Sequence, residues 1–122
     1  MAISRDDVVT WIKNYAQVID ENNEMLTDLD REIGDADHGA NMNRGFKAVM
    51  TKLPASEDKD IGTVLKSVAM TLLSTVGGAG GPLYSTIFME AGKVIGPKME
   101  IGLADWYTAL QAAATGVANR GK

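Results

Sequence analysis

One stretch decides the fold of this chain: Asp30-Arg31-Glu32-Ile33-Gly34-Asp35-Ala36-Asp37-His38-Gly39-Ala40-Asn41-Met42-Asn43-Arg44-Gly45. Successive helical residues are rotated by about 100°, so on one unbroken helix Asp35 would point about 160° away from Asp37. Gly34 interrupts the stretch, because glycine takes left-handed backbone angles at little cost and commonly ends helices. We predict that one helix ends near Ile33 and another begins after Asp37. The carboxylates that would then face a common point are those of Asp30, Asp35 and Asp37.

Three carboxylates gathered in this way need a compensating charge. Two of them about 4 Å apart repel by about 1 kcal/mol in water and about 4 kcal/mol at an effective dielectric of 20. Oxygen ligands suit hard cations, but the calcium-binding EF-hand pattern fails, because Ala40 and Phe46 stand where its glycine and glutamate belong. Mg²⁺ usually shares its ligands with substrate phosphates. The residues favour Mg²⁺ with a phosphate compound; the alternative is a polar turn in which Asp37 only caps the next helix.

The composition indicates one globular domain spanning residues 1–122. Apolar residues make up 45% of the chain, which is enough for a packed core. The net charge of −4 disfavours direct binding to nucleic acid or to an anionic membrane. There is no cysteine, no secretory signal and no apolar run long enough to span a membrane. We therefore expect a cytoplasmic protein.

Apolar residues recur at helical spacing in six segments, and no period-two alternation is long enough to predict a strand. Ser4 and Asp7 resemble a capping box before the first segment, and Asn22-Asn23 ends it. Pro54 stops the third segment, and Gly96-Pro97 ends the fifth. The predicted class is all-α, an antiparallel bundle with short connections. The six segments are about 8–19, 25–33, 42–53, 61–76, 83–95 and 106–117.

A second notable stretch is the glycine-rich turn Gly77-Gly78-Ala79-Gly80-Gly81-Pro82, which lies between two helical patterns. Pro82 suits the first position of the later helix. A helix N-terminus presents unpaired N–H groups with partial positive charge, which suits a phosphate. The alternative is a flexible or close-packed corner between helices. Phosphoryl transfer needs a metal site and a phosphate site. The carboxylates would supply the metal site and the glycine-rich turn the phosphate site.

The stretch Gly34-Asp35-Ala36-Asp37-His38-Gly39-Ala40-Asn41-Met42, followed by 77–84, resembles the nucleotide-binding L subunit, or L domain, of dihydroxyacetone kinase. The resemblance implies a barrel of antiparallel helices with the nucleotide site at one end. It implies that Asp30, Asp35 and Asp37 coordinate two Mg²⁺ ions that bridge the phosphates of ADP or ATP. The implied nucleotide contacts are His38, Gly39, Ala40, Asn41, Thr75, Gly78, Ala79, Gly80 and Gly121.

The implied activity is that of a kinase subunit. It would accept a phosphoryl group from a phosphotransferase-system donor, the M subunit, and pass it to dihydroxyacetone held covalently by a histidine of the K subunit. No catalytic residue is expected in this chain, and Glu32 and Arg44 are expected to be surface or supporting residues. The alternatives are the L domain of an ATP-dependent kinase and a nucleotide-sensing module that binds a transcription regulator. A homodimer is also left open.

Three features depart from the family pattern. Ala36 replaces a common glycine, and Gly80 replaces a common serine, so backbone groups alone would contact the phosphate there. The family unit has about eight helices, whereas this sequence predicts six. We therefore expect residues 1–122 to lack the C-terminal part of the family domain, including a Gly-Asp-Lys-Thr stretch that helps to enclose the base.

Overall fold

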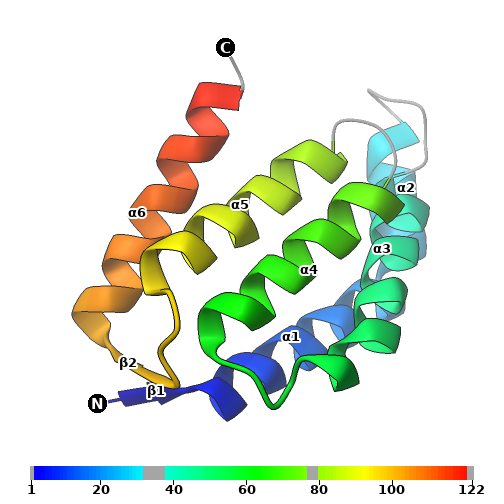
Figure 1. Ribbon diagram of the computed structural model, residues 1–122. Coiled ribbons are helices and arrows are strands. Elements are labelled where there is room, and N and C mark those ends of the chain that lie inside the picture. Colours follow the sequence, from blue (N-terminus) through cyan, green and yellow to red (C-terminus); the bar gives the residue numbers. More distant parts are fainter. Residues whose placement is uncertain (1, 32–37, 77–79, 121–122) are drawn as a thin grey trace.

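The computed structural model describes residues 2–31, 38–76 and 80–120 (Figure 1). Within these ranges there are six α-helices, so the predicted all-α class is confirmed. The elements, in chain order, are β1 (Ala2–Ser4), α1 (Arg5–Glu21), α2 (Asn23–Arg31), α3 (His38–Lys52), the 3₁₀-helix η1 (Leu53–Ala55), α4 (Ile61–Thr75), α5 (Gly80–Ile95), β2 (Glu100–Gly102) and α6 (Leu103–Arg120).

The interval between α2 and α3 falls where the sequence predicted it. Helix α2 ends at Arg31 and α3 begins at His38, directly after Asp37. Asp30 thus lies in α2, whereas Asp35 and Asp37 lie outside the described residues. The predicted capping box is also present at the start of α1, where the Asp7 N–H donates to Ser4 Oγ at 3.1 Å and the Ser4 N–H donates to Asp7 Oδ2 at 3.0 Å.

The two short strands correct the prediction that the chain holds none. Strands β1 and β2 pair antiparallel, with Ile3 opposite Ile101, and the Arg5 N–H extends the pairing by donating to the Met99 carbonyl at 2.8 Å. Three-residue strands are too short to produce a period-two signal in the sequence. The ribbon ties the start of α1 to the start of α6.

One proline boundary differs from the prediction. Helix α5 begins at Gly80, so Pro82 is its third residue rather than its first. Its missing N–H is still harmless there, because the first turn of a helix has unpaired N–H groups. Helix α3 ends at Lys52, before Pro54 as predicted, and Pro54 lies in η1.

Helices α4 and α5 run antiparallel and pack closely because glycines face each other near the beginning of α4 and the end of α5. A Cβ atom on Gly92 would lie only 3.0 Å from the Gly62 carbonyl oxygen, and one on Gly62 would collide with the Gly96 carbonyl. The Gly62 N–H donates to that same carbonyl at 3.0 Å. The opposite ends of the pair, the end of α4 and the start of α5, consequently lie together (Figure 1), and a Cβ atom on Gly81 would lie only 2.7 Å from the Val76 carbonyl oxygen.

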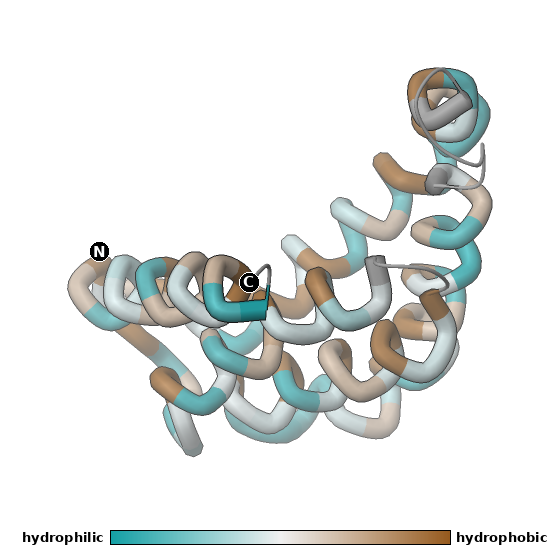
Figure 2. Tube along the Cα trace, turned by 90° about the horizontal axis from the view of Figure 1, so that it is seen from above, coloured by the Kyte–Doolittle hydropathy of each residue, from teal (hydrophilic) through white to brown (hydrophobic). Residues whose placement is uncertain are grey.

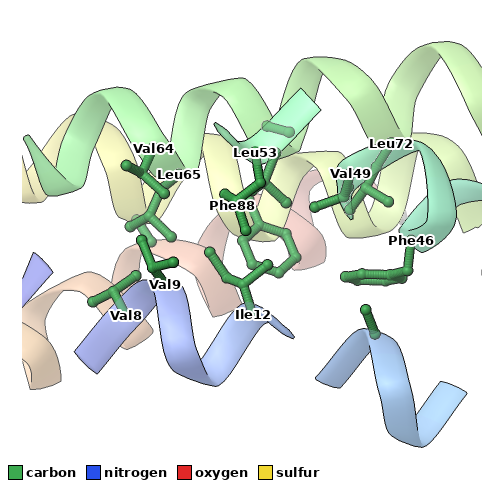
Figure 3. Packing of buried hydrophobic residues seen from close by; sticks show 14 of the residues in the cluster. Val8, Val9, Ile12, Phe46, Val49, Leu53, Val64, Leu65, Leu72 and Phe88 are labelled. Carbon is green, nitrogen blue, oxygen red and sulfur yellow. The ribbon is translucent and has the colours of Figure 1, made fainter. Parts of the chain in front are cut away.

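The core lies between α1, α3, α4 and α5 (Figure 3). Ile12 of α1 points toward Phe88 of α5, and Phe46 of α3 is almost fully buried. Burying an aliphatic or aromatic side chain of this size contributes about 1.5–3 kcal/mol. The ring centroids of Phe46 and Tyr15 are 4.9 Å apart, which joins α3 to α1.

Hydrophobic and hydrophilic residues alternate around the helices (Figure 2). Each described helix can therefore present an apolar face to its neighbours and a polar face to water. In the described ranges, no helix combines the length and the hydropathy that crossing a membrane would need.

Candidate nucleotide site

The start of α3 lies beside the end of α4, at the end of the molecule where α5 begins (Figure 1). The guanidinium Nε of Arg44 donates to the Thr75 carbonyl at 3.0 Å. The next residue, Gly45, is so close to Val76 that a Cβ atom there would collide with the valine side chain. Because α5 begins at Gly80, its first turn belongs to this same end.

Arg44 also contacts the first turn of its own helix. Its Nη2 donates to Asn41 Oδ1 at 2.6 Å. One guanidinium therefore links a predicted nucleotide contact on α3 to the backbone of another on α4. The sequence assigned Arg44 only a surface or supporting role. The sequence pattern did not predict the hydrogen bond from Arg44 to Thr75, because the two residues are 31 positions apart.

The other described site residues have local partners. The Thr75 hydroxyl donates to the Thr71 carbonyl at 2.6 Å, within α4. In this arrangement the hydroxyl can accept a hydrogen bond from a ligand but does not donate one to it. Gly39 is buried against α2, where a Cβ atom would collide with the Asn23 carbonyl and lie 2.6 Å from Thr27 Oγ1. Close packing of α2 on α3 is thus sufficient reason for glycine at this position. Ala40 is exposed.

Several predicted residues lie outside what the structure describes. These are Asp35, Asp37, Gly78, Ala79 and Gly121, together with the side chains of Asp30 and His38. Residues 2–31, 38–76 and 80–120 contain no group of three His, Asp or Glu side chains that could hold a metal ion. The assignment of Asp30, Asp35 and Asp37 to Mg²⁺ stays a prediction.

The charge at the helix ends fits a phosphate group. The first turns of α3, α4 and α5 contain no acidic residue, whereas those of α1, α2 and α6 do. Acidic side chains are favourable at helix N-termini, because they offset the partial positive charge there. Asp60 is the N-cap of α4 and Asp37 directly precedes α3, so α5 is the helix whose start a bound anion can occupy. The exposed guanidinium of Arg44 adds a full positive charge nearby.

Comparison with known proteins assigns the family. The model of the DAK2 domain matches residues 32–122, which include the glycine-rich turn and all of the acidic stretch except Asp30 and Arg31. The chain belongs to the DAK2 domain family. The resemblance read from the two motifs is thereby confirmed.

Among relatives of this DAK2 domain are kinase subunits from two bacteria. The ADP-binding subunit DhaL of the PEP-dependent dihydroxyacetone kinase of Escherichia coli (strain K12) is 49% identical over 122 residues, which is 100% of this chain and 58% of the relative. The corresponding subunit of kinase 1 from Listeria innocua is 35% identical over 122 residues, 100% of this chain and 61% of the relative. A probable dihydroxyacetone kinase of Dictyostelium discoideum is 29% identical over 111 residues, 84% of this chain and 17% of the relative. The chain spans less than two thirds of the length of each of these relatives.

Proposed function

We propose that this DAK2 domain is the ADP-binding part of a dihydroxyacetone kinase that takes its phosphoryl group from a phosphotransferase-system donor. The observation that carries the proposal is the contact of α3 with the end of α4 through Arg44, which joins two of the predicted nucleotide contacts, Asn41 and Thr75. Two bacterial relatives that align with the whole chain are named ADP-binding subunits, which supports ADP as the ligand.

Each part of the site would have a separate task. Asp30, Asp35 and Asp37 would hold two Mg²⁺ ions, which when bound offset the charge of the phosphates and of the transferring phosphoryl group. Backbone N–H groups at Gly78, Ala79 and Gly80 would bind the phosphate oxygens, as a helix N-terminus does. His38 and Asn41 would position the phosphates or the ribose. Catalysis would thus consist of positioning and charge stabilisation.

The reaction needs two partners. A donor M subunit would phosphorylate the bound ADP, and a K subunit would hold dihydroxyacetone as the acceptor. The relatives aligned with the whole chain are both named ADP-binding subunits, whereas the Dictyostelium kinase is less similar and aligns over a small part of its length. This difference favours a donor-dependent subunit over a segment of an ATP-dependent kinase.

A reconstitution with purified K subunit tests the proposal. We expect dihydroxyacetone phosphate to form when the phosphorylated donor protein is supplied with trace ADP, and to form far more slowly with free ATP alone. The matched control replaces Asp35 with Asn, which removes a proposed metal ligand with little change in volume. Fast turnover of free ATP without the donor would instead identify an ATP-dependent kinase domain. Loss of regulator binding without loss of turnover would indicate a separate regulatory role.

A further inference from the structure

We infer that Arg44 is a positioning residue of the nucleotide site: it orients the amide of Asn41 toward the ligand and fastens this turn of α3 to the end of α4. The inference rests on the proposed function. It is carried by two hydrogen bonds, from Nη2 to Asn41 Oδ1 at 2.6 Å and from Nε to the Thr75 carbonyl at 3.0 Å.

The first hydrogen bond determines which atom of the Asn41 amide faces Arg44 and which faces away from it. A guanidinium has only donors, so the amide atom that meets Arg44 must be the acceptor oxygen. The amide nitrogen, which only donates, is then turned away from Arg44. Phosphate and ribose oxygens accept hydrogen bonds, so the orientation set by Arg44 is the one that an ADP ligand requires. Without Arg44, the amide could turn its oxygen toward the phosphates and repel them.

The second bond holds the last residue of α4 against α3. The last carbonyls of a helix have no partner within the helix and carry partial negative charge. Thr75 is the final residue of α4, and its carbonyl is satisfied by Arg44. Arg44 therefore joins the part of the site proposed to contact the nucleotide through α3 to the part proposed to cradle the phosphates before α5.

Packing holds α3 against α4 independently of Arg44. Gly45 lies against Val76 and Leu72, and Met42 and Phe46 on the same helix are almost fully buried. Arg44 itself is exposed. Its replacement should therefore disturb the site much more than the fold.

Isothermal titration of the full chain with Mg-ADP tests the inference. Arg44→Lys keeps the charge but loses the planar fork that reaches two acceptors. We expect it to weaken binding at least about tenfold, as loss of a charged hydrogen bond does, with an unchanged unfolding midpoint. The matched control is Lys47→Met, which removes a positive charge one turn further along α3, where Lys47 pairs with Asp20 at 3.7 Å on the surface. It should bind as the wild type does.

A double-substitution cycle separates positioning from direct contact. If Arg44 acts through Asn41, Arg44→Lys should cost little further affinity in an Asn41→Ala background. Asn41→Asp adds a test that leaves Arg44 in place: aspartate still accepts from Arg44 but has no N–H, so Mg-ADP binding should be lost while the fold is kept.

Three results would overturn the inference while leaving the proposed function standing. They are unchanged Mg-ADP affinity in Arg44→Lys, fully additive losses in the double-substitution cycle, and unchanged affinity in Asn41→Asp. The second would mean that Arg44 acts on nucleotide binding independently of Asn41. A wild-type chain that binds no Mg-ADP would overturn the inference and the proposed function together.

Discussion

Single side chains set where several helices begin, and Asp60 is the clearest example. Its carboxylate accepts from the Thr63 N–H at 2.8 Å and from the Thr63 hydroxyl at 2.9 Å, which caps α4. The hydrogen bond from the Thr63 N–H is the main reason why the pKa of Asp60 lies below its ordinary value of 3.8. A lowered pKa in the folded state means that the stabilisation is complete above about pH 4 and is lost as the pH falls through the folded-state pKa.

We predict that Asp60→Ala lowers the free energy of unfolding by about 1 kcal/mol at pH 7, because it removes an N-cap. The difference from the wild type should shrink as the pH falls from 3.8, the ordinary pKa, through the lower pKa of the folded state, where the native carboxylate becomes protonated. Urea unfolding of both proteins at pH 7 and near the acid limit of the folded state measures this. A difference that stays constant across the range would contradict the assignment of the cap to the ionised carboxylate.

Contacts between residues close in the sequence could be predicted, whereas contacts between residues far apart in the sequence could not. The Ser4 and Asp7 cap was predictable, because its partners are three residues apart and their types are diagnostic. The link from Arg44 to Thr75 was not, because only the folded arrangement of α3 and α4 brings those residues together. The metal ligands were selected by their charge and by the expected helix break; α2 ends at Arg31 and α3 begins at His38, and residues 32–37 lie outside the described ranges.

At the scale of elements, the α4 and α5 pair depends on the absence of side chains at Gly62 and Gly92. A Cβ atom at Gly92 would lie 3.0 Å from the Gly62 carbonyl oxygen and 3.1 Å from Lys66 Cγ. We predict that Gly92→Ala destabilises the fold by about 1–3 kcal/mol through overpacking, partly offset by about 1 kcal/mol from alanine's higher helix propensity. Gly62→Ala should cost more, because the obstacle there is backbone, the carbonyl of Gly96.

A third glycine provides the control for these substitutions. A Cβ atom at Gly102 would meet nothing within 4 Å, so Gly102→Ala should leave the midpoint of thermal unfolding close to that of the wild type. Circular dichroism melts of the three variants measure the order. Equal midpoints for Gly62→Ala and Gly102→Ala would show that the helices can separate at no cost, which contradicts the close packing.

Helical periodicity predicted the number and order of the helices because each one buries an apolar face over several turns. It did not predict the β-ribbon, whose strands are three residues long, nor the start of α5 two residues before Pro82. It also could not show that Gly62 and Gly92 face each other. That contact depends on how α4 and α5 are placed, which no local pattern records.

For the whole molecule, the arrangement of helices brings three helix ends together. Helices α4 and α5 run antiparallel, so the end of α4 and the start of α5 lie at the end of the molecule where α3 begins (Figure 1). The DAK2 match covers residues 32–122, and the relatives named ADP-binding subunits align with the whole chain. The chain therefore carries the elements proposed to bind the metal ions and phosphates.

The central claim is that Mg²⁺ and the phosphates of ADP occupy this end of the molecule. Calorimetric titration of the full chain with ADP, with and without Mg²⁺, for the wild type and for Asp35→Asn, measures it most directly. We predict Mg²⁺-dependent binding by the wild type, loss of binding in Asp35→Asn, and the same helical circular dichroism for both. Binding that is unchanged by Asp35→Asn, or that needs no Mg²⁺, would contradict the claim.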